Sequence, residues 1–222
     1  MEIEGFVKKL ADYTNFDNSK VMNQYHKSCE YSKQTCTNLY LYLKNISKLK
    51  PTILLVGEAP GYKGCKKSGI PFTSERILKE NPFFGLENGY IIRKEKKPES
   101  ESTATKIWQE LNNIKHQFLP LFWNSFPFHP YQVDIKTKKE KNRHPSEYEI
   151  ETIGIPFLND LITLFPSLMF FSGVGKKGFE TLESIGKTVF YIRHPANDYH
   201  NEFPKTFKEF FKSIDDLTGQ NI

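Results

Sequence analysis

Four short apolar runs constrain the fold of this chain more than any other feature of its sequence. They are continuous rather than alternating in polarity, which is typical of parallel strands that are covered on both faces. We expect strands at Thr52–Val56, Phe118–Trp123, Leu168–Ser172 and Val189–Ile192. Pro120 cannot donate a hydrogen bond to a neighbouring strand, so the second strand should begin later or bulge there.

Segments with helical spacing separate these runs. Apolar side chains recur three or four residues apart within them, as they do on the buried face of a helix. Helices are therefore predicted over residues 20–45 with a break, 103–114, 146–165, a short stretch after Gly175, and 207–214. Ser146 and Glu149 have capping-box spacing, and Gly154 and Pro156 should kink or divide the helix that follows. This alternation predicts an α/β fold, a three-layer α/β/α sandwich with a central four-stranded parallel sheet.

Length and composition limit the class of protein. The chain has 222 residues, and no apolar run approaches the ~20 residues that span a bilayer. We expect one domain over residues 1–222, with residues 1–50 as an N-terminal helical segment packed on it. Cys29, Cys36 and Cys65 form no CxxC, which argues against a disulfide framework and a four-thiolate metal site. We expect a cytoplasmic protein with no secretory signal and no membrane partner, and its net charge of +5 permits nucleic-acid binding.

Chemically useful residues follow each predicted strand. The first strand leads into Gly57–Gly61 (GEAPG), the second into Asn124, the third into Gly173–Lys176 and the fourth into Arg193–Pro195. The carboxyl ends of parallel strands meet at one edge of a sheet, and ligands gather there. A carboxylate, a carboxamide, a glycine-rich turn and an imidazole should therefore share that edge, which makes it the candidate site.

Four of these segments, in this order, resemble motifs of the uracil-DNA glycosylase superfamily. They are residues 54–61 (LLVGEAPG), residues 69–72 (GIPF), Trp123–Asn124 and Arg193–Pro195 (RHP). The likeness covers roughly residues 50–212 and is greatest to the bacterial and archaeal branches that carry GEAPG. It implies a parallel sheet between helices that binds DNA and cuts the N-glycosidic bond of flipped-out uracil or another deaminated base. It also implies that no metal or organic cofactor takes part.

The resemblance assigns roles to individual residues. Glu58 is similar to the residue that orients or deprotonates the attacking water, and His194 to the one that donates a hydrogen bond to uracil O2. Phe72 is similar to the aromatic residue on which the base stacks, and Asn124 to the one that reads its edge. The expected substrate-binding residues are Gly57, Ala59, Pro60, Gly61, Pro71, Phe72 and Asn124.

Contacts to DNA outside the base pocket are expected from two turns. The Gly173–Gly175 turn leads into a helix and would offer free N–H groups to a phosphate, although an ordinary strand-to-helix turn has the same pattern. The segment after Pro195 resembles the loop that wedges into the duplex, with Asn197 or Tyr199 filling the gap. The expected DNA-binding residues are Gly173, Gly175, Lys176, Arg193, Asn197 and Tyr199.

The chain departs from the family pattern at several positions. It lacks the four cysteines of the iron–sulfur branch. Tyr62–Cys65 stands where the GEAPG branch often has an acidic residue that excludes thymine. Tyr62 is the alternative candidate for excluding the methyl group of thymine. Thr73–Arg76 replaces a glycine-rich segment, and Ala196 replaces a serine.

Two charged stretches and two histidines complete the candidates. Arg93–Ser102 and Lys136–His144 should form exposed loops, and the second stretch, which directly follows the candidate site, is equally compatible with a role there. His129 and His144 are expected to serve structure or to face solvent. We favour a monomeric, monofunctional DNA glycosylase. The alternatives are a catalytically weak or inactive DNA-damage-binding module on the same fold and a small-molecule hydrolase that uses Glu58 as base.

Overall fold

The computed structural model describes residues 1–94, 97–114, 119–197 and 200–219, with only the backbone of Asn197. Its helices and helical turns are α1 Ile3–Asp12, α2 Ser32–Lys48, α3 Cys65–Ser68, α4 Glu75–Glu80, η1 Leu86–Asn88, α5 Ser102–Ile114, α6 Glu147–Glu149, η2 Ile150–Gly154, α7 Ile155–Leu164, α8 Lys176–Ser184, η3 Pro195–Asn197 and α9 Glu202–Thr218. Its strands are β1 Val21–Met22, β2 Ile53–Gly57, β3 Leu121–Asn124, β4 His129–Val133, β5 Glu140–Asn142, β6 Phe170–Val174 and β7 Val189–Ile192. Among the described residues, no helix is long and apolar enough to cross a membrane.

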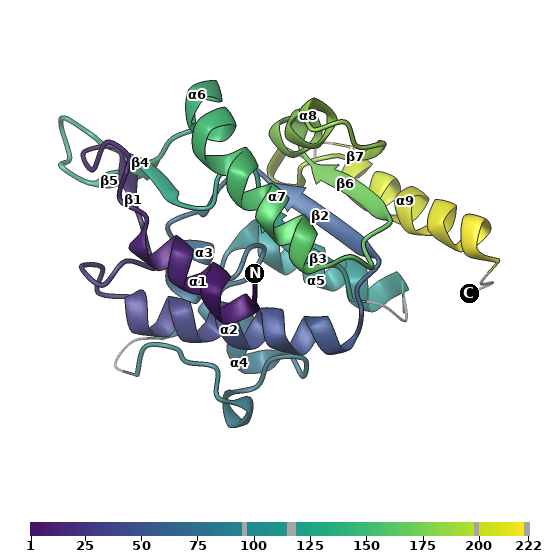
Figure 1. The fold of residues 1–222 in the computed structure, drawn as a ribbon, viewed down its shortest axis with the longest axis horizontal. Helices are drawn as coiled ribbons and strands as arrows, with labels where there is room; N and C mark the ends of the chain where they lie inside the picture. The colour runs from purple at the N-terminus through teal and green to yellow at the C-terminus, as the bar shows by residue number, and fades with distance from the viewer. Residues whose placement is uncertain (95–96, 115–118, 198–199, 220–222) are drawn as a thin grey trace.

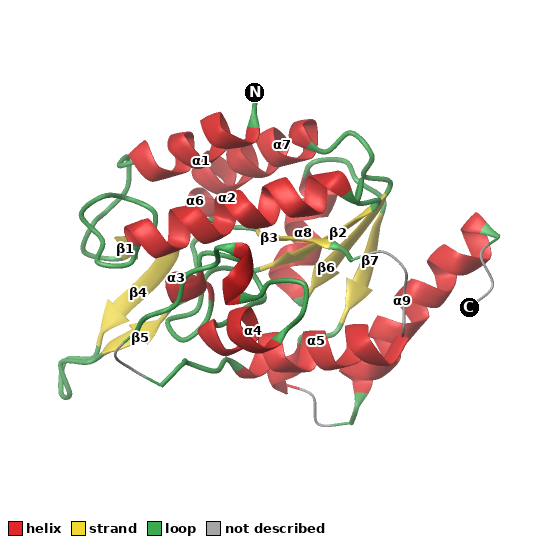
Figure 2. Cartoon of the chain, turned by 90° about the horizontal axis from the view of Figure 1, so that it is seen from below, coloured by secondary structure: helices red, strands yellow, loops and turns green. Residues whose placement is uncertain are grey.

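A four-stranded parallel sheet forms the centre of the molecule, with the strand order β3-β2-β6-β7. Figure 1 shows this sheet with helices around it, and Figure 2 shows α1 and α7 on one side of it and α5 and α9 on the other. The predicted α/β/α sandwich with four parallel strands is therefore confirmed. The strands begin and end within three residues of the predicted runs, and β3 begins at Leu121, after Pro120, as expected from that proline.

Adjacent residues of β3 show why both faces of the sheet must be covered. Successive side chains of a strand point to opposite faces, so Phe122 and Trp123 pack in different layers. The Phe122 ring packs edge-on against Trp108 of α5 at a centroid distance of 5.7 Å, and the Trp123 ring contacts Phe6 of α1 at 5.4 Å. All four rings are buried, and such aromatic pairs contribute about 0.5–1.5 kcal/mol each beyond the area that they bury.

The helix that follows Ser146 is widened rather than broken. Ser146 and Glu149 form the predicted capping box, and the backbone stays helical through Gly154 and Ile155. Between α6 and α7, η2 is a π-helical turn, which accommodates one extra residue. A Cβ atom on Gly154 would lie 1.9 Å from the Ser125 carbonyl oxygen, so only glycine allows the helix to pass this close to the end of β3.

The helix predicted from residue 20 begins only at Ser32, and residues 21–22 form β1 instead. The Asn23 side chain explains this difference. Its amide donates to the carbonyl oxygens of Leu10 and Tyr13 and its oxygen accepts from the N–H of Tyr25, so it holds a turn that competes with helix formation. β1 pairs with β4, and β4 pairs with β5, in a second, antiparallel sheet. The prediction that residues 136–144 form only a loop was therefore wrong for β5.

The segment Arg93–Ser102, predicted as a solvated loop, is attached to a buried carboxylate. Glu75 is 1% exposed and accepts hydrogen bonds from the backbone N–H groups of Arg93 and Glu99 and from the Arg93 guanidinium at 2.6 and 2.8 Å. Burial alone would raise the pKa of Glu75, but these hydrogen bonds outweigh burial and lower it to about 2. Arg93 and Glu99 are therefore held by Glu75, which belongs to Thr73–Arg76, the stretch that departs from the family pattern.

We expect Glu75→Gln to lower the free energy of unfolding by about 3–5 kcal/mol at pH 7, because it removes the buried charge that pairs with Arg93 and leaves Arg93 only its longer contact with Glu99. The ionised Glu75 stabilises the fold above its ordinary pKa, and this stabilisation is lost as the pH falls towards 2. Urea unfolding of the wild type and of Glu75→Gln should therefore show a difference in the free energy of unfolding that shrinks steadily below pH 4.5. Glu80→Gln, at an exposed position of the same helix, is the control. An equal loss in both variants, or none in Glu75→Gln, would contradict the role of Glu75.

Candidate active site

The register of the sheet aligns the ends of all four strands. Gly57 of β2 pairs with Asn124 of β3, and one residue earlier Val56 pairs with Gly173 of β6. Val174, which follows Gly173, pairs with Ile192 of β7. One row of paired residues therefore crosses the sheet at this point. Asn124 belongs to this row, and Glu58, Gly175 and Arg193 directly follow it. This is the edge at which the sequence predicted a site.

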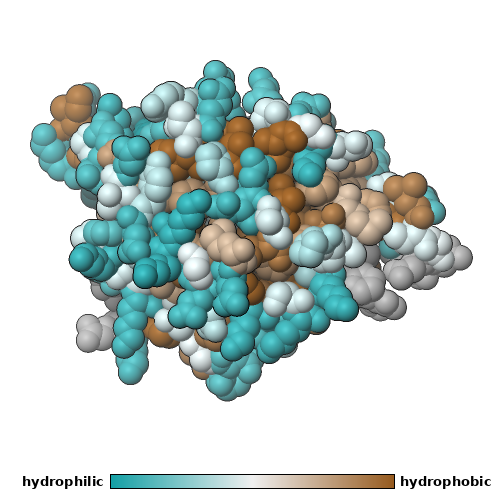
Figure 3. All heavy atoms as spheres, in the orientation of Figure 1, coloured by the Kyte–Doolittle hydropathy of each residue, from teal (hydrophilic) through white to brown (hydrophobic). Residues whose placement is uncertain are grey.

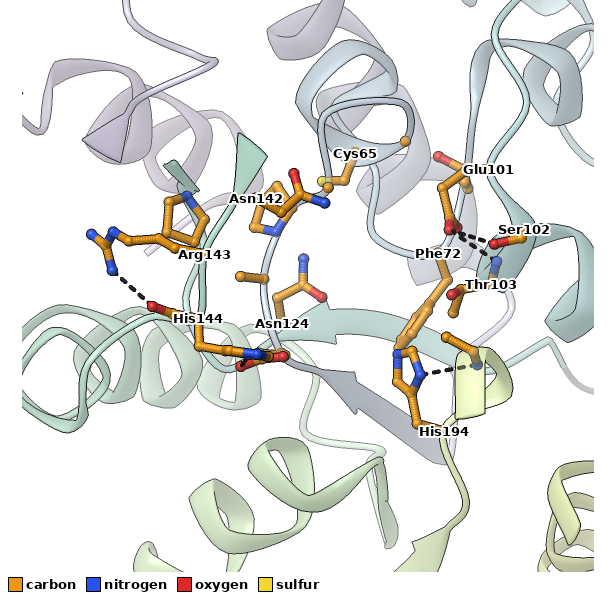
Figure 4. Close-up of a pocket in the computed structure, with 18 residues that line it drawn as sticks. Cys65, Phe72, Glu101, Ser102, Thr103, Asn124, Asn142, Arg143, His144 and His194 are labelled. Atoms are coloured by element: carbon orange, nitrogen blue, oxygen red, sulfur yellow. Dashed lines mark hydrogen bonds and ion pairs between the residues drawn. The ribbon is translucent and has the colours of Figure 1, made fainter. Parts of the chain in front are cut away.

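A cavity of about 350 Å³ opens at this edge. Glu58, Phe72, Asn124 and His194, which come from four separate segments, all line it. In Figure 4, Asn124 lies near the middle of the cavity, between His144 on one side and Phe72 with His194 on the other. The other lining residues are Ala59, Pro60, Gly61, Gly64, Cys65, Thr73, Glu101, Ser102, Thr103, Pro130, Asn142, Arg143, His144 and Ala196.

Phe72 and Asn124 pack over Gly57, which leaves no room for a larger residue. A Cβ atom on Gly57 would lie 2.6 Å from the Phe72 ring and 2.9 Å from Asn124 Oδ1. Phe72 has a φ of +53°, a left-handed conformation that costs a non-glycine residue about 1–2 kcal/mol. Its carbonyl oxygen accepts a hydrogen bond from Trp108 Nε1 at 3.0 Å, which holds this conformation. The Phe72 ring is therefore fixed beside the carboxamide of Asn124.

Asn124 is buried at the end of β3, with its carboxamide at the cavity. Within the described part of the chain, no hydrogen bond restrains this carboxamide, so packing against Gly57 and Phe72 holds it. Pro71, which precedes Phe72 in the chain, is buried and does not line the cavity.

The His194 ring lines the cavity next to the turn that follows β7. Its Nδ1 atom accepts a hydrogen bond from the Ala196 backbone N–H at 3.1 Å. An accepting nitrogen carries no proton, so the neutral ring has its proton on Nε2 and can donate from there. Burial lowers the pKa of His194, and this outweighs the opposite effect of the nearby carboxylates of Glu58 and Glu101. The site therefore favours a neutral imidazole that donates one hydrogen bond.

Gly175 gives this imidazole its space. A Cβ atom there would lie 3.2 Å from His194 Cβ and 3.3 Å from Cδ2, and the φ of Gly175 is +85°. Lys106 of α5 donates a hydrogen bond to the Pro195 carbonyl oxygen at 2.8 Å. This bond holds the backbone directly after His194, and Gly175 leaves room for the ring.

Glu58 has a second histidine as its partner. Its Oε1 atom lies 2.7 Å from Nδ1 of His144, which is 86 positions further along the chain. The His144 side chain is 87% exposed and that of Glu58 is 29% exposed, so the pair lies at the open side of the cavity. His144 faces solvent, as expected from the sequence, but it also lines the cavity. His129, by contrast, is buried and hydrogen-bonded through both ring nitrogens, as expected of a structural residue.

Two further groups of cavity residues were not predicted from the sequence. Glu101 accepts hydrogen bonds from the N–H groups of Thr103 and Ala104 and so caps α5, whose first turn reaches the cavity. Asn142 and Arg143 come from the end of β5, and Arg143 forms two hydrogen bonds to the Glu149 carboxylate. A helix start and a basic stretch are the only sequence signals at these positions, and neither indicates a cavity by itself.

The predicted phosphate site at the Gly173–Gly175 turn is not formed as expected. Gly173 lies inside β6, and a Cβ atom there would be 2.1 Å from the backbone nitrogen of Phe179, so this glycine allows α8 to approach the sheet. The N–H of Gly175 is not free, because it donates to the Ile192 carbonyl oxygen at 2.8 Å. Lys176 is exposed and lies 3.3 Å from Glu180.

The other residues predicted to contact DNA are Arg193, Asn197 and Tyr199. Arg193 lies 3.4 Å from the Glu202 carboxylate, and its N–H donates to Thr206. Tyr199 and the side chain of Asn197 lie outside the described residues, so the choice of a wedge residue stays a prediction. Ala196, which stands where the family often has serine, lines the cavity. Tyr62 does not line it, whereas Gly64 and Cys65 do, so the idea that Tyr62 blocks thymine has no support in this geometry.

The described residues include no group of three or more His, Cys, Asp or Glu side chains that could hold a metal ion. Cys29, Cys36 and Cys65 are free thiols, and burial raises the pKa of Cys65 to about 12, which disfavours its reactive thiolate form.

Comparisons with known proteins agree with this geometry. The model of the Uracil DNA glycosylase superfamily matches residues 43–218. Among solved structures, wild-type SMUG2 of Pedobacter heparinus has the same fold, with a TM-score of 0.65 at 16% sequence identity, covering 99% of this chain and 98% of that one. No curated protein matches the chain.

Proposed function

The chain belongs to the uracil DNA glycosylase superfamily, a family of DNA glycosylases, and we propose that its substrate is flipped-out uracil in DNA. The observation that carries this proposal is the cavity lined by Glu58, Phe72, Asn124 and His194. A base inside a duplex cannot reach such a cavity, so the target nucleotide must leave the base stack. The reaction is hydrolysis of the bond between the base and its deoxyribose.

Asn124 would select the base. A carboxamide can accept a hydrogen bond from uracil N3–H and donate one to uracil O4, whereas cytosine presents the opposite pattern at both atoms. A buried site with mismatched polar groups can discriminate by about 10⁴-fold. The burial of Asn124 and its packing on Gly57 support this role, since they restrict rotation of the amide. The Phe72 ring would stack on the base, a contact of about 1–3 kcal/mol.

His194 and Glu58 would divide the chemistry of bond cleavage. As the bond breaks, negative charge builds on the base and positive charge on the sugar. A neutral imidazole with its proton on Nε2 would donate to uracil O2 and stabilise the departing anion. The Glu58 carboxylate would orient or deprotonate the attacking water, and its charge would favour the cationic sugar. His144, which lies 2.7 Å from Glu58, would hold that carboxylate in place.

Other parts of the proposal rest on the sequence alone. We expect a monofunctional enzyme that acts as a monomer in the cytoplasm. Its residues would supply an activated water and a stabilised leaving group, so the proposed reaction includes no metal or organic cofactor. The assignment to the GEAPG branch without iron–sulfur cysteines rests on the Gly57–Gly61 motif and on the presence of three cysteines.

An oligonucleotide assay tests the proposed function. Single- and double-stranded DNA with one uracil is incubated with the protein, and alkali then cleaves the strand at the abasic site. We expect strand cleavage with uracil and none with cytosine at the same position. Hypoxanthine, xanthine and mismatched thymine in the same sequence define the range of bases. Tight binding to uracil DNA without base release would instead support the DNA-damage-binding module, and activity on free nucleosides alone would support a small-molecule hydrolase.

A further inference from the structure

β4, β5 and their turn form a hairpin over residues 129–142, to which no catalytic role has been assigned. We call it the basic hairpin. Figures 1 and 2 show its turn projecting from the body of the molecule, away from the central sheet. The end of the hairpin away from the turn, its cavity end, is part of the site. Pro130 and Asn142 line the cavity there, and Arg143 and His144 follow directly.

Three contacts fix the cavity end of the basic hairpin to residues 60–66, and a fourth joins its two strands. His129 lies 2.6 Å from the Pro60 carbonyl oxygen and 2.7 Å from the Glu140 carboxylate. Lys66, which is buried, forms an ion pair with the same carboxylate. Asn142 accepts a hydrogen bond from the Tyr62 N–H at 3.1 Å. The direction of the hairpin is therefore set relative to the base pocket.

The far end of the basic hairpin is an ordered turn. Asp134 Oδ1 accepts from the N–H groups of Lys136 and Thr137 and from the Thr137 hydroxyl. The Asp134 backbone also exchanges hydrogen bonds with Lys138 and Lys139. The second oxygen of Asp134 forms an ion pair with Lys141. These bonds lower the pKa of Asp134 to about 2, with the Lys141 contact as the largest cause.

Three lysines of this turn face solvent without an acidic partner in the described structure. Both acidic residues of the basic hairpin are already engaged, Asp134 by Lys141 and Glu140 by His129 and Lys66. Lys136, Lys138 and Lys139 are all exposed. Beside them Ile135 is 85% exposed, and Figure 3 shows a small hydrophobic group among hydrophilic atoms at the projecting end. The turn thus presents a rigid cluster of positive charge.

We propose that the turn Asp134–Lys139 grips the DNA backbone beside the flipped nucleotide, through Lys136, Lys138 and Lys139. The inference rests on the proposed function, because it takes the strand in the cavity to be DNA. Lys139 and Lys138 precede the cavity residue Asn142 by three and four positions, respectively, which places them about 10–14 Å from the cavity along the strand. With one phosphate per ~3.4 Å of duplex axis on each strand, they reach phosphates about three to four nucleotides from the uracil.

A triple variant, Lys136→Gln, Lys138→Gln and Lys139→Gln, tests this grip. Each lysine that neutralises a phosphate contributes about 0.7–0.9 to the slope of log affinity against log salt. We therefore expect the slope for a 20-nucleotide DNA to fall by about 2–3 and the affinity at low salt to fall about 10- to 100-fold. The single-turnover rate of uracil release at saturating enzyme should stay within twofold of wild type, because no cavity residue is changed.

The matched control removes the same charge elsewhere. Lys44, Lys48 and Lys50 are exposed at the end of α2, which leads into the first residue of β2 and so lies at the opposite edge of the sheet. Replacing these three by glutamine should change the salt slope by less than 1. A short DNA with one nucleotide on each side of the uracil should bind the wild type and the hairpin variant equally.

Two results would overturn the proposal: an unchanged salt slope in the hairpin variant, or an equal loss in the control variant. Binding is also measured with undamaged DNA of the same length, which separates this inference from the proposed function. If no uracil is released but the hairpin variant still loses its salt slope, the grip stands and the proposed function fails. If uracil is released with equal slopes for wild type and variant, the grip fails and the proposed function stands.

Discussion

A Glu58→Gln variant is expected to lose about two to four orders of magnitude in the rate of uracil release while it still binds uracil DNA. Glutamine has nearly the same shape as glutamate, but it can neither take a proton from water nor carry the negative charge that favours a cationic sugar. Single-turnover release at saturating enzyme measures the chemical step, and fluorescence anisotropy with labelled DNA measures binding. A lower rate with unchanged affinity would place the carboxylate in the reaction itself.

The control for this experiment is Glu183→Gln, an exposed glutamate near the end of α8. It removes the same charge at the opposite edge of the sheet and should leave the rate unchanged. A Glu58→Gln enzyme as fast as wild type would remove Glu58 from the mechanism. His144 lies 2.7 Å from Glu58. A crystal structure of Glu58→Gln would show whether the glutamine side chain keeps this position beside His144.

His194→Ala is expected to slow uracil release by about 10²- to 10³-fold, the usual effect of removing one preorganised donor to a developing anion. His194→Gln should recover part of this loss, because its amide can still donate. The pH profile provides a further test. Since burial lowers the pKa of His194, the loss of rate that arises from its protonation should lie below pH 6.5, and His194→Gln should lack it. Single-turnover rates from pH 5 to 8 show both effects.

His26→Ala is the matched control, because His26 lies in the turn before α2 and does not line the cavity. It should keep both the rate and the pH profile of the wild type. A full rate in His194→Ala would contradict the proposal that His194 stabilises the leaving base. A profile in which the acid loss persists unchanged in His194→Gln would assign that loss to another group.

Local sequence patterns were sufficient to predict the sheet. Continuous apolar runs appear as β2, β3, β6 and β7, because helices on both sides of a parallel sheet favour apolar side chains at successive positions. The residues of β2 and β3 are all buried, whereas most of those in the edge strand β7 are not. The same reasoning located the site, since parallel strands in register bring their carboxyl ends to one edge. It did not predict β1, because two residues of strand between turns carry no periodic signal. It left the role of Gly173 open, because the pattern is the same whether a glycine serves a phosphate or a closely packed helix.

The sequence by itself determined the alternation of strands and helices and which side chains follow each strand, since these depend on residues close together in the chain. Only the tertiary structure decided that His144 contacts Glu58 across 86 positions, that Glu101 reaches the cavity, and that Glu75 binds Arg93 and Glu99. These contacts depend on how loops fold back over the sheet. Many foldings of such loops satisfy the same local pattern, and only the packing of the whole chain selects one of them.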